Sequence, residues 1–281
     1  MKKKSNKKGE DIFCYDMGER GARGHETQGR RKVVGNQLSF SAAEAYKLLR
    51  TNLIFSMSDE RECKIIGVTS ALRGEGKSVT SVNLAYTLAE TKKRVLLIDA
   101  DMRIPVVAKI LEIPEAPGLS NVLAGVSQLN DAVQVSPLLK SLFVLPAGEI
   151  PPNPSELLSS VRMQQMLGVL SESFDYIIVD IPPVNAVSDS LAVSKLLSGM
   201  IMVVRQNYCN RHSLAEAMRQ LEFLKVKVLG FVMNDTGSAK TKYKKYGHRN
   251  RYNQGYGYGY RQPGTDQAGD SKAETSETVG V

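Results

Sequence analysis

Short apolar runs alternate with longer amphipathic stretches through the central part of the chain. The apolar runs predict strands at 64–69, 94–99, 142–145, 176–180, 200–204 and 228–233. Helical periodicity predicts helices between them, at 78–91, 106–111, 156–170, 190–197 and 213–223. Parallel strands are covered by helices on both faces and therefore read as continuous apolar segments. The pattern predicts an α/β fold with a mostly parallel central sheet flanked by helices.

One more helix is predicted before the first strand. Apolar residues such as Leu48 and Leu49 recur at helical spacing within residues 41–57. Ser41 is followed three residues later by Glu44, which is the form of a capping box. We therefore expect the helix to begin at Ser41.

The two ends of the chain differ in composition from the centre. Residues 1–38 are polar, basic and without periodicity, and residues 237–281 are of low complexity. We expect disordered ends around one domain at 39–236. The chain carries a net charge of +8, and residues 239–262 hold seven Lys or Arg and no acid. Such a tail suits an anionic lipid, a nucleic acid or an acidic partner, and equally a solvated segment.

Cysteine and histidine are few and scattered. The chain has three of each, without a CxxC pair, which argues against a disulfide framework, a zinc site or a histidine-based triad. No apolar run approaches the roughly 20 residues that span a bilayer. We expect a cytosolic protein that reaches a membrane only through surface contacts or a partner.

The strongest chemical signal is ALRGEGKS, residues 71–78, which lies between a predicted strand and a predicted helix. Glycines in such a turn let backbone N–H groups converge on phosphate oxygens at a helix N-terminus. Lys77 would reach the β- and γ-phosphates, and the Ser78 hydroxyl would bind Mg²⁺. The residues that we expect to hold the nucleotide are Gly74, Glu75, Gly76, Lys77, Ser78 and Val79.

Three acids follow predicted buried strands. Asp99 and Asp101 stand in VLLIDADMR, and Asp180 ends YIIVD before two prolines. Ligands of open α/β sheets bind outside the carboxyl ends of the strands. A lone acid there is often only a helix cap, but three acids in this order indicate a metal-bound phosphate.

ALRGEGKS, VLLIDADMR and YIIVDIPP resemble the Walker A, Walker A′ and Walker B motifs of the bacterial tyrosine kinases of capsule and exopolysaccharide synthesis. The resemblance covers about residues 39–234 and includes PPNPSELLSS, residues 151–160. It is closest to the cytoplasmic Gram-positive type. ATPases of the ParA/MinD group share the layout but usually carry a lysine where this chain has Leu72.

The resemblance implies an ATP-dependent protein-tyrosine kinase that uses Mg²⁺. It implies catalytic roles for Lys77, Asp99, Asp101 and Asp180, with Ser78, Asp101 and Asp180 around the metal. Asp99 is then the candidate base, although the spacing alone would allow Asp101 to take that role.

Six of the eleven tyrosines lie within eighteen residues of the tail: Tyr243, Tyr246, Tyr252, Tyr256, Tyr258 and Tyr260. They alternate with glycine and basic residues and cannot form a core. Aromatic rings among cations also suit stacking on nucleic-acid bases. The resemblance implies instead that they are autophosphorylation sites, and no nucleic acid is expected.

The resemblance also implies partners. The family's ExxRxxR helix motif is present as Glu44, Lys47 and Arg50, with lysine replacing the middle arginine. This implies a homo-oligomeric ring, such as an octamer, in which one subunit's tail enters its neighbour's site. The expected activator is a membrane protein of the chain-length-regulator type, and the expected substrates are proteins of polysaccharide synthesis.

Two other functions fit parts of the sequence. One is a ParA/MinD-type ATPase whose tail binds lipid or nucleic acid. The other is an assembly factor that binds nucleotide without turnover. Phosphotyrosine in the protein distinguishes both from a kinase.

Overall fold

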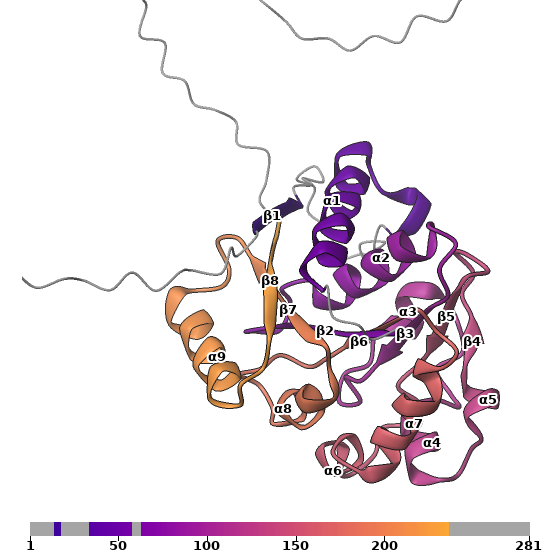
Figure 1. Ribbon diagram of the computed structural model, residues 1–281. Coiled ribbons are helices and arrows are strands. Elements are labelled where there is room, and N and C mark those ends of the chain that lie inside the picture. Colours follow the sequence, from indigo (N-terminus) through magenta and orange to yellow (C-terminus); the bar gives the residue numbers. More distant parts are fainter. Residues whose placement is uncertain (1–13, 18–33, 58–62, 236–281) are drawn as a thin grey trace, which may run out of the picture. The chain divides into compact units, whose positions relative to one another are not determined.

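Figure 1 shows the protein as a computed structural model, which describes residues 14–17, 34–57 and 63–235. Residues 1–239 form one unit, and the second unit, 240–281, lies outside the described residues. The sheet has eight strands in the order β1-β8-β7-β2-β6-β3-β5-β4. All neighbours run parallel except β4 and β5. The strands are β1 (Cys14–Met17), β2 (Lys64–Ser70), β3 (Val95–Asp99), β4 (Gln134–Val135), β5 (Leu142–Leu145), β6 (Tyr176–Asp180), β7 (Gly199–Arg205) and β8 (Val228–Asn234).

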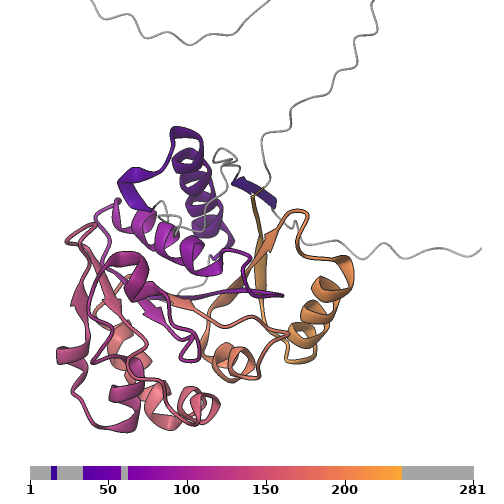
Figure 2. The same cartoon turned by 180° about the vertical axis from the view of Figure 1, so that it is seen from behind.

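Helices cover both faces of the sheet (Figures 1 and 2). One face packs against α1 (Phe40–Ser56), α2 (Lys77–Ala89) and α3 (Val107–Leu111). The other packs against α4 (Leu119–Ala124), α5 (Leu129–Ala132), α6 (Pro154–Leu158), α7 (Val161–Ser171), α8 (Asp189–Val193) and α9 (Arg211–Phe223). Short 3₁₀ helices occur at Gly35–Gln37 and Ser194–Leu196. The predicted α/β fold is confirmed.

Alternate strand residues fill two separate cores. Leu96 and Ile98 of β3 face the core beneath α4 and α7, whereas Leu97 faces the core beneath α1 and α2. Because every β3 residue is buried on one face or the other, this strand reads as an uninterrupted apolar run.

Two helix predictions were wrong in detail. The helix predicted at 156–170 is two helices, because the Ser160 hydroxyl accepts a hydrogen bond from Met163 N and starts α7. The first helix begins at Phe40 and is capped by Ser39, whose hydroxyl accepts from Ala42 N. The predicted cap Ser41 therefore lies inside the helix.

Several short elements were not predicted. Strand β1 lies within the N-terminal segment that we expected to be disordered, and it pairs with β8 at the sheet edge. Helices α4 and α5 and the two-residue strand β4 are too short to show periodicity. The domain boundaries at 38 and 236 stay a prediction. Within the described ranges, no helix is long and apolar enough to cross a membrane.

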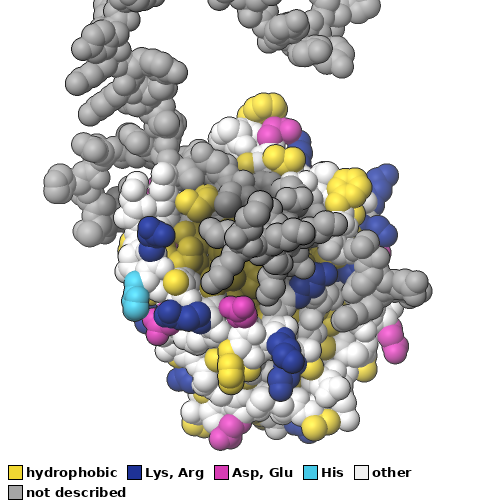
Figure 3. Space-filling view, turned by 60° about the vertical axis from the view of Figure 1, so that its left-hand side comes forward, with side chains coloured by type: hydrophobic (Ala, Val, Ile, Leu, Met, Phe, Trp, Pro, Cys, Tyr) yellow, Lys and Arg dark blue, Asp and Glu magenta, His cyan; other side chains and the backbone are white. Residues whose placement is uncertain are grey.

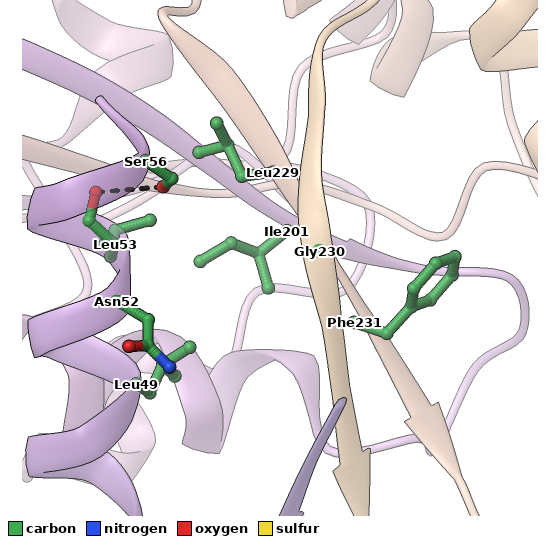
Figure 4. A pocket seen from close by; sticks show the side chains of 8 residues that line it. All are labelled: Leu49, Asn52, Leu53, Ser56, Ile201, Leu229, Gly230 and Phe231. Atoms are coloured by element: carbon green, nitrogen blue, oxygen red, sulfur yellow. Dashed lines mark hydrogen bonds between the residues drawn. The ribbon is translucent and has the colours of Figure 1, made fainter. Parts of the chain in front are cut away.

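A small crevice lies between α1 and strands β7 and β8 of the sheet (Figure 4). Its lining is Leu49, Asn52, Leu53, Ser56, Ile201, Leu229, Gly230 and Phe231. Figure 3 shows hydrophobic side chains gathered in a hollow on the face of the molecule that it presents. The crevice is mostly apolar and has no charged side chain in its lining, so it does not suit a polyphosphate.

Candidate active site

The loop between β2 and α2 has the backbone that a phosphate cradle requires. Gly74 and Gly76 have φ angles of +78° and +93°, in the left-handed region that favours glycine. A Cβ atom on Gly76 would also lie 2.0 Å from Asn234 Nδ2. Helix α2 begins directly after Gly76, so the unpaired N–H groups of its first turn are available to an anion.

Lys77 lies between two of the predicted acids. Its Nζ is 3.0 Å from Asp101 Oδ2, 3.1 Å from Asp180 Oδ2 and 3.2 Å from Ser78 Oγ. Burial disfavours the charged ammonium, but the Asp180 and Asp101 carboxylates outweigh it and raise the pKa of Lys77. The loop lysine therefore stays protonated and neutralises the acids that face it.

Asp180 is held from its other side by a residue that the sequence analysis missed. Ser81 Oγ donates to Asp180 Oδ1 at 3.0 Å and to Lys77 O at 2.9 Å. Ser81 stands four residues after Lys77, one turn along α2, and this spacing is the signal that could have identified it.

Asp99 is fully buried beside the same cluster. In register it pairs directly with Asp180 on the neighbouring strand. Its carboxylate accepts from the backbone N–H groups of Asp101, Val106 and Val107 at 3.1, 3.2 and 3.1 Å. Burial, reinforced by the charge of Asp180, raises the pKa of Asp99 to about 7. Asp99 thus orders the loop after β3, and its assignment as the base stays a prediction.

Arg103 connects the loop after β3 to the start of helix α8. Its Nε and Nη2 donate to Asp189 Oδ2 and Oδ1 at 2.7 and 3.0 Å. Asp189 is fully buried at the start of α8, and Ser155 of α6 also donates to it. Burial opposes the charge of Asp189, but the hydrogen bonds from Arg103 and Ser155 lower the pKa of this carboxyl. The PPNPSELLSS motif therefore contacts the site through Ser155, a contact not evident from the sequence.

We expect Arg103→Lys to reduce autophosphorylation by about tenfold, because lysine keeps the charge but cannot form the two parallel bonds. Initial rates would be compared with those of Arg162→Lys, a substitution outside the site. A rate equal to that of the wild type would show that the Arg103–Asp189 fork does not position the loop.

The donor atoms around Lys77 fit magnesium. Mg²⁺ prefers oxygen ligands and usually takes one or two carboxylates, with substrate phosphates and water completing its shell. Asp101, Asp180 and the Ser78 hydroxyl supply such oxygens around a bound cation, the lysine ammonium. No cluster of three or more His, Cys, Asp or Glu side chains suited to a metal occurs in the described part of the chain.

Residues at the carboxyl ends of β7 and β8 contact the loop between β2 and α2. Glu75 is fully buried, and its carboxylate accepts from Leu72 N at 2.7 Å and Arg205 N at 3.3 Å. Asn234 Nδ2 donates to Glu75 O at 2.8 Å. Of the predicted nucleotide ligands, Glu75 therefore turns its side chain into the protein. Arg205 and Asn234 were missed because neither lies in a recognisable motif.

The other predicted residues lie outside this cluster. Val79 is in the first turn of α2, two residues after Lys77. Glu44 and Lys47 form an exposed ion pair at 2.7 Å on α1, and Arg50 Nη1 donates to Thr87 O of α2 at 2.7 Å. The six tail tyrosines lie outside the described residues.

Comparison with known proteins agrees with this geometry. The AAA domain family matches residues 63–228. The tyrosine-protein kinase YwqD of Bacillus subtilis is 39% identical over 206 residues, which cover 73% of this chain and 85% of the relative. The kinase domain of the Escherichia coli tyrosine kinase ETK superposes with a TM-score of 0.70 at 32% identity, covering 83% of this chain and 87% of that one. The chimerical protein CapA2B2 gives a TM-score of 0.69 at 30% identity, with 75% and 92% covered.

Proposed function

The chain belongs to the bacterial tyrosine kinases and is an ATP-dependent protein-tyrosine kinase, and from this premise we propose how its residues perform the transfer. The observation that carries the proposal is the convergence of Lys77, Asp101 and Asp180 at the carboxyl edge of β2, β3 and β6. We propose that its principal substrate is its own tyrosine-rich tail, and that it serves capsule or exopolysaccharide synthesis.

Phosphoryl transfer requires positioning and neutralisation of charge more than covalent catalysis. The loop amides and Lys77 bind the β- and γ-phosphates. With the Lys77 ammonium on the phosphates, Asp101, Asp180 and Ser78 would hold Mg²⁺. When bound, this metal neutralises phosphate charge. Ser81 would keep Asp180 in place, because its hydroxyl contacts the Asp180 carboxylate and the Lys77 backbone carbonyl and does not depend on where the Lys77 ammonium lies.

The acceptor is a tyrosine hydroxyl in line with the γ-phosphate. Its oxygen forms the new P–O bond, ADP leaves with the electrons of the broken bond, and a carboxylate takes the proton. We assign the proton to Asp99, whose raised pKa favours proton acceptance. Asp101 is the more exposed of the two and lies nearer the lysine, which suits the metal.

We expect Asp101→Asn and Asp180→Asn to lower autophosphorylation by at least about a hundredfold, since each removes a charge from a shared phosphoryl-transfer site. Asp99→Asn should lose activity for two reasons. It removes the candidate base, and the asparagine NH₂ group would face a backbone N–H whose hydrogen bond the carboxylate now accepts. The control is Asp131→Asn on the exposed surface of α5. Phosphotyrosine would be measured by mass spectrometry, and near-normal activity in any of the three would remove that residue from the catalytic set.

We further propose a partner and an assembly. A membrane protein of the chain-length-regulator type recruits the kinase to the inner face of the membrane and activates it. The kinase itself forms a ring through α1. The exposed Glu44–Lys47 pair supports this surface, whereas Arg50 contributes within the subunit by joining α1 to α2.

A further inference from the structure

The strand order fixes the direction in which a nucleotide lies across the loop. Strand β2 stands between β6 and β3 on one side and β7 and β8 on the other. Asp180 and Asp101, the acids that would serve the γ-phosphate, follow β6 and β3. The nucleoside end must therefore extend from the loop toward the ends of β7 and β8.

A turn at the end of β7 lies on that side and is fastened to the loop. Arg205 N donates to Glu75 Oε1 at 3.3 Å, and Arg205 Nη1 donates to Gly74 O at 3.4 Å. The N–H groups of Tyr208 and Cys209 donate back to Arg205 O at 3.3 and 3.1 Å. Asn207, which lies between Arg205 and Tyr208 in the chain, has a φ of +59°, a conformation that asparagine tolerates. The turn therefore has a defined shape and a defined position beside the phosphate loop.

Tyr208 projects from this turn next to Gly74. Its hydroxyl oxygen would be 3.5 Å from a Cβ atom placed on Gly74. The Arg205 guanidinium lies over the ring, 5.3 Å from its centroid, and is itself held by Asp235 at 2.8 Å. The cation supports the ring from one side, yet half of the tyrosine surface (50%) stays exposed.

We infer that Tyr208 is the platform on which the purine base of the nucleotide stacks. Aromatic rings bind bases through their faces, and a cation on the far side adds to this attraction. Other large exposed aromatic residues of the described part, Phe40, Phe55 and Phe223, lie on or end α1 and α9, away from the loop. Arg205, Asn234 and Asp235 hold the platform, and Tyr208 contacts the ligand.

The inference rests on ATP binding by the loop, so its test must separate the base from the phosphates. The chain contains no tryptophan. Tyr208→Trp therefore introduces a single tryptophan at the platform, which can be excited without exciting the tyrosines. Phe223→Trp introduces one at the end of α9, five residues before β8 begins and hence near the amino ends of the strands. We expect ATP to quench the fluorescence of the first variant and not of the second. Inorganic tripolyphosphate should displace ATP from both without quenching by itself.

Affinity gives an independent measurement. Loss of a base–aromatic stack is worth a factor of roughly 5 to 150 in affinity. We expect Tyr208→Ala to weaken ATP binding by about that factor while leaving tripolyphosphate binding unchanged, and Tyr208→Phe to bind ATP as the wild type does. Equal weakening of both ligands by Tyr208→Ala, or quenching by tripolyphosphate alone, would overturn the platform. Failure of tripolyphosphate to bind any variant would instead contradict the phosphate loop.

Discussion

Replacing Lys77 by methionine should reduce autophosphorylation by at least about a thousandfold. The variant loses the ammonium that neutralises phosphate charge in the transition state. It also leaves Asp101 and Asp180, 9% and 0% exposed at their side chains, without the cation that now separates them. Removing one member of a buried charged group typically costs about 3 to 5 kcal/mol of stability. The free energy of unfolding should therefore fall together with the activity.

The structure suggests a way to separate these two losses. Mg²⁺ fits the oxygens of Asp101, Asp180 and Ser78, so it should restore part of the thermal stability of Lys77→Met without restoring phosphotyrosine. Unfolding would be followed by circular dichroism with magnesium and with sodium at equal ionic strength, and phosphotyrosine by mass spectrometry. Lys93→Met serves as the control, because Lys93 pairs with Asp175 at the other end of the strands. Phosphotyrosine at the wild-type level in Lys77→Met would contradict the assignment of the loop.

The sequence predicted the strands well because burial on both faces makes each of them a continuous apolar run. Strands β5 and β6 begin and end as predicted, and the other four differ by one residue at one or both ends. The helix over 156–170 failed for a local reason. Ser160 can cap a helix as readily as it can lie inside one, and the periodicity on either side does not reveal the break.

The residues of the candidate site were likewise predicted only in part. Lys77, Asp101 and Asp180 were predictable, because a glycine-rich loop and acids at strand ends must meet at one edge of a parallel sheet. Asp189 and Arg205 were not, since each acts through a contact between residues at least 86 positions apart. Ser81 was missed although its place one helical turn after Lys77 could have identified it. Glu75 stays a predicted nucleotide-binding residue of the loop, and its carboxylate contacts the backbone of Leu72 and Arg205.

Replacing all six tail tyrosines by phenylalanine should abolish most phosphotyrosine, because these residues are the expected acceptors. The tail lies outside the described residues, so this prediction rests on sequence and charge. Residues 239–262 carry a charge of +7, and each phosphate adds about −1.5 to −2 at neutral pH. About four phosphates would therefore cancel the basic charge and release the tail from an acidic surface or a neighbour's site.

Light scattering should show the mass of the wild-type assembly falling as phosphate accumulates, and the mass of the six-phenylalanine variant staying constant. The control is a peptide of residues 237–262 with its tyrosines intact, which the variant should still phosphorylate in trans, since its catalytic residues are unchanged. A variant that hydrolyses ATP, modifies neither its own chain nor the peptide, and retains salt-sensitive binding of the tail to lipid or DNA would favour an ATPase of the ParA/MinD type.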